Sequence, residues 1–537
     1  MKKIAILLVL LCFAPILKSQ NWSDDLGMID SLHIGGDVAI IQDLYNDDDN
    51  MLYIGGPFKY ANLEQVNQII SWDGYSYYKF QSGINPFGTI NTITKYNNKI
   101  VIGGTFPDAS GAANTYCLAQ WTGTHWQSVG GGGLTGEVCD LTVHNDTLFI
   151  GGYFGNIGSV EYNKVAAFSN NNWINISDNG FGNFCAAMEI FTKELYASAW
   201  NWGIRRYLGN GEWEMHPDQP NGYIYELKTD TINNFLYVCG GFNQVGDSIS
   251  YGVAMWDGFR WNYMDAYCQT TLWPQSVAIY RGDLFTGCGQ YYDNETNYRT
   301  FITRWNGETW DSIGGAFNDN IFALEVFRDT LYIGGGFSYW GGDSPNPTHR
   351  SKGLVKLYMP DNGCDYLKPR INTWADTFYI YNGEAEVNLY NNNPYADSWE
   401  WDFGTSTGSV TASQAVEHTY TDPGEYYVQV SVTQDGCVKT ANKTIYIELG
   451  NRVPQFEQIA MQIFPNPSSN GFTVKTSLAS YQNAEIIIAG LNGHLQSKIP
   501  ITGETTDIST KGWKPGVYIC NLFVEGKLLK TEKLVFK

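Results

Sequence analysis

Charged residues and histidines are scarce in this chain, and long apolar runs are almost absent. Only 16% of the 537 residues are charged, and seven are histidines. After residue 20, no stretch approaches the 18 or more consecutive apolar residues that a membrane-spanning helix needs. Low charge with 43% hydrophobic residues excludes a long disordered protein. The lack of a second apolar run predicts that the exported chain has no transmembrane segment.

The one long apolar run lies at the N-terminus. Met-Lys-Lys precedes an apolar stretch over residues 4–17, and Lys-Ser-Gln follows it. This order is typical of a secretory signal peptide, so we expect residues 1–20 to be removed. Cys12 lies within the run without the small residues that a lipid-acceptor cysteine normally follows. We therefore predict no lipid anchor.

Basic residues are outnumbered by acidic ones, 33 to 54, which gives a net charge of −21. Loss of the three lysines in the signal peptide makes the exported chain −24. Nucleic acid and anionic membranes are poor partners for such a surface. Ten cysteines become nine after cleavage, and export permits disulfides, so at least one thiol stays free or pairs with another chain.

A strand that ends in a glycine pair recurs seven times in the first two thirds of the chain. The clear copies are Leu52-Tyr-Ile-Gly-Gly, Ile100-Val-Ile-Gly-Gly, Leu148-Phe-Ile-Gly-Gly, Leu236-Tyr-Val-Cys-Gly-Gly and Leu331-Tyr-Ile-Gly-Gly, and the degenerate copies begin at Leu195 and Leu284. Their spacings are 48, 48, 47, 41, 48 and 47 residues. This is the range of a four-stranded propeller blade.

Behind these strands, six hairpins carry an aromatic residue on each arm. The pairs are Trp72 and Tyr77, Trp121 and Trp126, Phe168 and Trp173, Tyr207 and Trp213, Trp256 and Trp261, and Trp305 and Trp310. The unmatched halves are Val355 to Tyr358 at one end of the region and Trp22 at the other. We therefore predict that the N-terminal strand completes the last blade of a closed, seven-bladed, all-β propeller over residues 21–360.

The glycine pair followed by aromatic residues resembles the kelch type of propeller, although the middle of the repeat departs from that pattern. Kelch-like propellers serve as binding scaffolds and, less often, as oxidases or lyases. The resemblance therefore leaves the function open.

Residues 361–449 carry a different pattern. It includes Trp399-Glu-Trp-Asp-Phe-Gly, His418-Thr-Tyr and Pro423-Gly-Glu-Tyr. These motifs resemble the PKD domain, an immunoglobulin-like sandwich, but Thr405 and Ser406 replace the Asp-Gly that usually follows the first motif. Cys364 and Cys437 flank the region and are a candidate disulfide that would close a long loop.

Residues 455–537, after a short linker, contain Ile463-Phe-Pro-Asn-Pro, Gly516-Val-Tyr-Ile and the terminal Lys533-Leu-Val-Phe-Lys. Together they resemble the type A C-terminal sorting domain of the type IX secretion system of Bacteroidota, a small β-sandwich. The resemblance implies the type IX machinery as a partner, and surface attachment or release as the destination. The alternative is a further structural sandwich.

No catalytic residue, cofactor or metal site is predicted. No pair of histidines has metal-ligand spacing, and no Ser, His and Asp arrangement stands out. The acidic run Asp47-Asp-Asp49 offers oxygens for calcium, but it aligns with the hairpin turns of the other copies, which favours a solvated turn. Cys268 and Cys288 are a candidate disulfide in the propeller. Cys139 and Cys185 could pair or be buried thiols.

Aromatic residues gather in loops that share one rim of the predicted propeller. They are Trp200, Trp202, Tyr267, Trp273, Tyr291, Tyr292, Tyr298, Tyr339 and Trp340. Exposed aromatic rings stack on sugars and anchor protein partners equally well, and they also pack loops together. Replacing Trp273 and Trp340 by alanine would test their part in binding.

These features predict an exported binding or adhesion protein. The propeller would recognise a polysaccharide or a protein, the PKD domain would be a spacer, and the last domain would direct secretion. The alternative is an extracellular carbohydrate-active or oxidative enzyme that uses the central face of the propeller, which would require acidic or histidine side chains to converge there. A third hypothesis is a structural surface protein without a ligand.

Overall fold

The structure is a computed structural model, and strands form nearly all of its regular structure. It describes residues 21–537 apart from 24–31, 35–36, 48–50, 62–63, 82, 178–180, 183, 200–202, 217, 259, 265–272, 294–296, 342–346, 360–362, 381–382, 407, 450–460, 479–480, 482–483, 491–494 and 525–526. The predicted signal peptide, His494, Cys268 and three of the predicted rim aromatics lie outside these residues.

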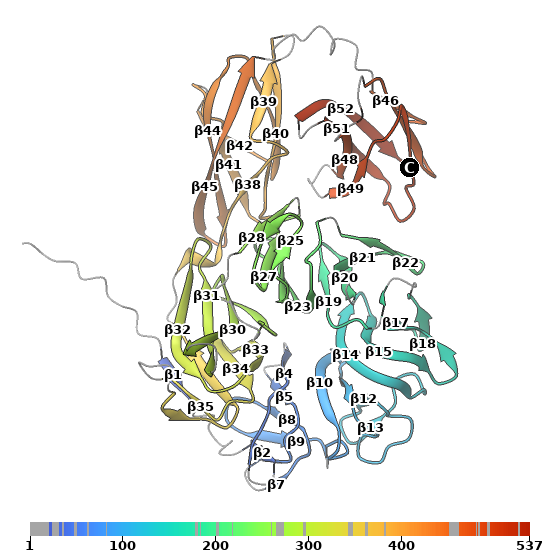
Figure 1. Ribbon diagram of the computed structural model, residues 1–537, viewed down its shortest axis with the longest axis vertical. Coiled ribbons are helices and arrows are strands. Elements are labelled where there is room, and N and C mark those ends of the chain that lie inside the picture. Colours follow the sequence, from blue (N-terminus) through green and yellow to red (C-terminus); the bar gives the residue numbers. More distant parts are fainter. Residues whose placement is uncertain are drawn as a thin grey trace, which may run out of the picture.

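Seven antiparallel sheets occupy the first two thirds of the chain (Figure 1). The first three are β4 (Asp43–Asp47), β5 (Met51–Gly55), β8 (Ile69–Trp72) and β9 (Tyr77–Lys79); β10 (Thr89–Tyr96), β11 (Lys99–Thr105), β12 (Leu118–Trp121) and β13 (Trp126–Gln127); and β14 (Leu134–His144), β15 (Thr147–Ile157), β17 (Val165–Ser169) and β18 (Asn172–Asn175), with β16 (Val160–Glu161) beside β15. The fourth and fifth are β19 (Met188–Phe191), β20 (Glu194–Ala199), β21 (Gly203–Gly209) and β22 (Glu212–Met215); and β23 (Tyr223–Asp230), β24 (Phe235–Gly241), β27 (Val253–Trp256) and β28 (Trp261–Tyr263). The last two are β29 (Val277–Tyr280), β30 (Asp283–Asp293), β31 (Asn297–Trp305) and β32 (Trp310–Phe317), extended by β35 (Tyr339–Trp340) and β36 (His349–Arg350); and β33 (Ile321–Phe327), β34 (Thr330–Gly335), β37 (Leu354–Tyr358) and β1 (Asn21–Ser23).

Two smaller sheets, one of four strands and one of two, accompany these seven. They are β2 (Leu32–Ile34) and β3 (Asp37–Val38), joined to β6 (Tyr60–Ala61) and β7 (Glu64–Gln65), and β25 (Gln244–Val245) with β26 (Ser248–Ile249).

The first strands of the seven sheets contact one another in sequence. β4 contacts β10, β10 contacts β14, and the series continues through β19, β23, β29 and β33 back to β4. The N-terminal strand β1 is the outer strand of the seventh sheet, where Trp22 lies opposite Leu357 on β37. The sequence predicts this pairing of the two ends of the region.

The glycine pair has a steric cause. A Cβ atom added to Gly103, the first glycine of the pair on β11, would lie 2.4 Å from Val138 Cγ1 on the first strand of the next sheet. At Gly334 on β34, it would lie 2.6 Å from Ile41 Cγ2. Any side chain would therefore force neighbouring sheets apart, which explains why glycine marks the second strand.

The six aromatic hairpins form as the sequence predicts, with each aromatic pair in cross-strand register. Tyr207 and Trp213 accommodate their extra residue in a bulge between Tyr207 and Gly209. The rings also pack between sheets: Trp72 on β8 is buried edge-on against Tyr332 on β34, with ring centroids 5.6 Å apart. Aromatic residues thus fill the space between adjacent sheets.

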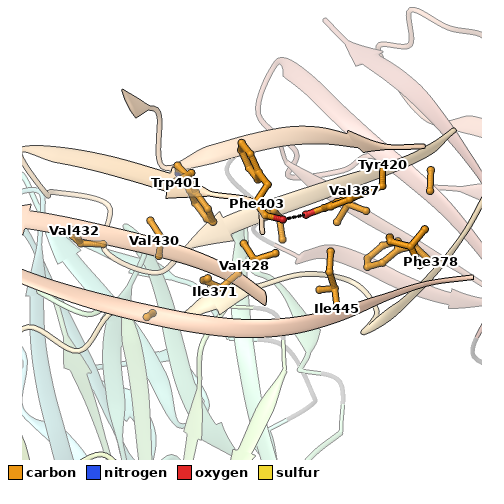
Figure 2. Packing of buried hydrophobic residues seen from close by; sticks show 14 of the residues in the cluster. Ile371, Phe378, Val387, Trp401, Phe403, Tyr420, Val428, Val430, Val432 and Ile445 are labelled. Atoms are coloured by element: carbon orange, nitrogen blue, oxygen red, sulfur yellow. Dashed lines mark hydrogen bonds between the residues drawn. The ribbon is translucent and has the colours of Figure 1, made fainter. Parts of the chain in front are cut away.

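The PKD-like region is a two-sheet sandwich preceded by a short 3-10 turn, η2 (Cys364–Tyr366). One sheet contains β38 (Ile371–Asn372), β40 (Ala385–Asn391) and β43 (Ala415–Tyr420), and the other contains β39 (Thr377–Ile380), β45 (Cys437–Leu449), β44 (Gly424–Gln434), β41 (Ser398–Asp402) and β42 (Val410–Ala412). Figure 2 shows the packing of its buried core, where the Tyr420 hydroxyl donates to the Phe403 carbonyl oxygen at 2.9 Å. A disulfide joins Cys364 to Cys437 across a separation of 73 residues.

The C-terminal unit also has two sheets. They are β46 (Met461–Phe464), β47 (Phe472–Thr476) and β50 (Thr505–Ile508), and β49 (Leu495–Pro500), β48 (Ala484–Gly490), β51 (Gly516–Val524) and β52 (Lys527–Phe536). Asn466 of the Phe-Pro-Asn-Pro motif accepts from the Val535 N–H at 2.9 Å and donates to the Lys533 carbonyl oxygen at 2.6 Å. The motif therefore anchors the terminal strand.

Candidate recognition surface

Each of the seven sheets has two distinct ends. At one end, which we call the turn end, the first strand turns back into the second. The glycine pair lies at the other end, which we call the glycine-pair end. Both C-terminal units lie on one side of the seven sheets in Figure 1. Their contacts with the sheets decide which end remains open to a partner.

The sandwich is fixed to the turn end of the fifth and sixth sheets. Asn233, in the turn between β23 and β24, donates to the Tyr366 carbonyl oxygen at 3.0 Å and accepts from the Lys368 N–H at 2.7 Å. The Lys368 ammonium lies 3.0 Å from the buried carboxylate of Asp283 at the start of β30. Asn392 donates to the Asn233 carbonyl oxygen at 2.8 Å. A buried polar joint therefore holds the sandwich against the seven sheets. The sequence predicted the sandwich only as a spacer.

The C-terminal unit contacts the turn end of the fourth sheet. Arg206 on β21 donates to the Gln496 carbonyl oxygen at 3.2 Å. Lys511 pairs with Glu212 at the start of β22. Gly512 packs so closely on Leu208 that an added Cβ would lie 2.8 Å from Leu208 Cβ. The described contacts of both C-terminal units thus fall at the turn end and leave the glycine-pair end uncovered.

At the glycine-pair end, a β-bulge changes the direction of a tyrosine side chain. The register of β23 on β24 shifts between Ile224 and Glu226, so Tyr225 is the extra residue. Its ring is 37% exposed, and its hydroxyl lies near Gly241, where an added Cβ would be 3.4 Å from it. Burial is the main cause that raises the pKa of this hydroxyl, and Tyr223 adds to the rise. Tyr225 therefore presents a neutral phenol.

Trp273 also lies beside the same glycine. An added Cβ on Gly241 would lie 3.2 Å from Trp273 Cδ1, and the Trp273 ring is half-buried. Trp273 and the Tyr225 hydroxyl therefore both lie close to Gly241. This pair is the best-defined part of the surface.

Of the other predicted rim residues, Trp340 requires a correction. Tyr339 and Trp340 form β35, where strand alternation sends neighbouring side chains to opposite faces. Tyr339 is exposed, but Trp340 is only 7% exposed and packs in the core with its ring 5.0 Å from that of His349. Trp340 is therefore a core residue and not part of the exposed rim, so Trp340→Ala would not test ligand binding.

Tyr291, Tyr292 and Tyr298 lie on the long hairpin of β30 and β31, with Tyr291 opposite Tyr298 in register. Their position at the glycine-pair end follows from this register. Trp200, Trp202 and Tyr267 lie outside the described residues and remain predictions.

Several exposed aromatics at this end were not predicted. Phe87 is 94% exposed ahead of β10, and Tyr153 is 57% exposed on β15 with the Lys164 ammonium 4.5 Å from its ring centroid. Tyr116 and Tyr223 are exposed as well. Tyr153 directly follows the glycine pair of its copy, so the rule that selected the other rim residues would have found it.

Of the acidic run that could offer oxygens to calcium, Asp48 and Asp49 lie outside the described residues. Asp47 is buried and accepts hydrogen bonds from the Met51 N–H and the Tyr53 hydroxyl, each at 3.2 Å, and Lys95 lies 3.4 Å away. These contacts tie its carboxylate to the protein. Within the described ranges, no group of three or more His, Cys, Asp or Glu residues could hold a metal ion.

The cysteines take several states. Cys288 is disulfide-bonded, whereas its predicted partner Cys268 lies outside the described residues. Cys139 and Cys185 are free thiols, and Cys185 lies ahead of β19 rather than on it. Burial raises the pKa of Cys139 to about 12, so its thiol is protonated at neutral pH.

Comparison with known families identifies two parts of the chain. Residues 383–449 match the family model described as a PKD domain, and residues 462–537 match that of the secretion system C-terminal sorting domain. No curated protein matches this chain. In the described part of the chain, no helix has the length and apolar character to cross a membrane.

Some solved structures align with the chain at low similarity. One is PorZ of Porphyromonas gingivalis, described as an essential bacterial surface component of the type-IX secretion system: it is 10% identical, with a TM-score of 0.24, over 96% of this chain and 100% of that chain. Domains 3 and 4 of rat CD4 are 13% identical, with a TM-score of 0.13, over 30% of this chain and 98% of that chain. Such TM-scores support no argument about fold or function.

The family matches settle how this protein leaves the cell. A sorting domain at the C-terminus indicates export through the type IX secretion system. The chain therefore carries a PKD domain and a type IX sorting domain, and it is exported to the cell surface or the extracellular space.

Proposed function

We propose that this protein is an exported recognition protein whose seven sheets form one closed, seven-bladed, kelch-like propeller over residues 21–360. Three features support a closed propeller. The first strands contact one another in an unbroken series that returns to β4, β1 completes the seventh sheet, and the glycine pairs allow neighbouring sheets to approach. Closure leaves no first strand without a neighbour on either side.

The glycine-pair end is the recognition face. The observation that carries this proposal is the division of the molecule. The described contacts of both C-terminal units fall at the turn end, which has fewer exposed aromatics, while the opposite end carries six: Phe87, Tyr116, Tyr153, Tyr223, Tyr225 and Tyr339. A sorting domain that directs the protein to the surface at one end leaves the other end free to meet a ligand. Adhesion to extracellular material is the role that this arrangement supports.

A neutral polysaccharide is the ligand class that best fits this face. Half-exposed aromatic rings such as Tyr225 and Trp273 stack on sugar rings, and the net charge of the chain disfavours polyanions. An enzyme at the central face is the weaker alternative. Acidic side chains do converge near the axis, but Asp43, Asp140 and Glu226 each accept a hydrogen bond from the main chain of the next sheet. These hydrogen bonds join neighbouring sheets, so we assign the three acids to the stability of the fold and not to catalysis.

Thermal unfolding of residues 21–537 with a panel of soluble neutral polysaccharides tests this proposal, because a ligand of the folded state raises the melting temperature. We expect one polysaccharide to stabilise the protein. Tyr225→Ala and Trp273→Ala should each weaken its Kd at least about tenfold, or about 1.4 kcal/mol.

Tyr78→Ala is the control, because Tyr78 is 50% exposed, more than Tyr225, but lies near the turn end of the first sheet. It should bind as the unaltered protein does. A panel without any stabilising polysaccharide, or equal weakening by Tyr78→Ala, would reject the polysaccharide face.

A further inference from the structure

Side chains at one repeated position connect four of the seven first strands to the first strand of the next sheet. The acceptors are Asp43, Asp140, Glu226 and Ser276, and the donors are the backbone N–H groups of Ile93, Met188, Val277 and Leu324, at 2.6, 2.5, 2.7 and 3.0 Å. Each donor belongs to the first strand of the following sheet. Three of these four connections use a carboxylate.

Two residues further along the first strands, a second layer of polar side chains faces the same way. In the fourth, fifth and seventh sheets it holds Glu189, Lys228 and Glu325, and the Lys228 ammonium lies 3.9 Å from the Glu325 carboxylate. The other sheets contribute Tyr45, Thr94, Thr142 and Ala278 at this position.

Five carboxyl groups therefore share one cation. Asp43, Glu189, Glu226 and Glu325 all act on Lys228 electrostatically, and Asp140 acts on Glu189 and Glu226. The remaining groups in the two layers are uncharged hydroxyls, the methyl groups of Ala187, Ala278 and Ala323, and the Tyr45 phenol. Full ionisation of all five acids would leave four unbalanced negative charges in a half-buried site.

We propose that these five acids and Lys228, which we call the axial cluster, are a proton-dependent lock on the seven sheets. The lock holds the sheets together most tightly at mildly acidic pH, and at alkaline pH it depends on Lys228. Protonation removes repulsion between the acids, and a protonated carboxyl still accepts the N–H of the next strand through its carbonyl oxygen. The lock concerns cohesion of the sheets and is independent of any ligand.

The titration of the cluster supports this direction. Burial raises the pKa of Asp140 to about 6, of Asp43 and Glu189 to about 7, and of Glu226 to about 8. The attraction of Glu325 is the largest cause that raises the pKa of Lys228. Because the unfolded chain releases these carboxyl protons near pH 4, the folded state binds more protons between about pH 4 and 8. Stability from this cluster therefore falls as pH rises through that window.

Thermal unfolding of residues 21–537 at pH 5 and pH 8.5 tests the lock. The unaltered protein should melt at least about 3 °C higher at pH 5. Lys228→Met removes the cation of the described cluster while keeping the length of the side chain. It should lower the melting temperature strongly at pH 8.5 and little at pH 5.

Two further variants keep the test decisive. Glu226→Gln mimics the protonated acid, so it should raise the melting temperature at pH 8.5 and reduce the difference between the two pH values. Lys79→Met is the control, since Lys79 pairs with Glu64 at 2.9 Å on the surface of the first sheet. Equal losses for Lys228→Met at both pH values, a Glu226→Gln protein that is less stable at pH 8.5, or a more stable parent protein at pH 8.5 would each overturn the proposal.

Discussion

Replacing Asn233 by alanine should uncouple the PKD domain from the seven sheets. The side chain is 1% exposed and makes four hydrogen bonds at the joint: to the Asp230 carboxylate at 2.7 Å, to the Tyr366 carbonyl oxygen at 3.0 Å, from the Lys368 N–H at 2.7 Å and from Asn393 at 3.0 Å. A buried group left without its partner costs about 1–3 kcal/mol. We expect a total loss of about 3–5 kcal/mol.

Calorimetry of the exported chain measures this uncoupling. The unaltered PKD domain and the seven sheets should unfold together, and Asn233→Ala should separate the PKD domain into an earlier transition. Asn442→Ala is the control, because Asn442 is exposed on the PKD domain and only accepts from Gln429 at 2.8 Å. A single, unshifted transition in Asn233→Ala would show that the joint contributes nothing.

Removing residues 21–23 should destabilise the seventh sheet. These residues form β1, whose three positions lie opposite Tyr358, Leu357 and Lys356. Without β1, the strand β37 becomes an open edge, which invites pairing with another molecule. A chain that begins at residue 24 should melt roughly 5–10 °C below one that begins at residue 21 and should associate as its concentration rises.

Asn21→Ala provides the control, since it keeps the backbone of β1 and its pairing with β37. It should melt within about 1 °C of the parent chain. If the chain that begins at residue 24 melted at the same temperature as the parent chain and eluted with it in size-exclusion chromatography, β1 would be dispensable. The case for a closed propeller would then lose its main support.

The repeat pattern predicted most of the local structure. Three repeated features are visible in the sequence itself: the glycine pairs, the aromatic hairpins and the split seventh repeat. From the split repeat, Trp22 could be placed opposite β37. The joint at Asn233 could not be predicted in this way. Its partners Lys368 and Asn392 are more than 100 residues away, and asparagine in a turn is unremarkable when the sequence alone is read.

The exposed residues of the candidate recognition surface were predicted less well than the strands. Trp340 was assigned to the rim because its loop lies there, but strand alternation in β35 turns its ring into the core. Tyr225 was missed because its exposure depends on a bulge, and a bulge adds one residue without any mark in the sequence. The axial acids were missed because they are spread over separate repeats.

Hydrogen–deuterium exchange of the exported chain, with and without the neutral polysaccharide that stabilises it most, tests the central claim most directly. If the glycine-pair end is the recognition face, amide exchange should slow around residues 221–226, 241–245 and 273–277 and stay unchanged in the PKD domain and at the turns near Asn233. Protection confined to the turn end or to the PKD domain, or no protection anywhere, would contradict it.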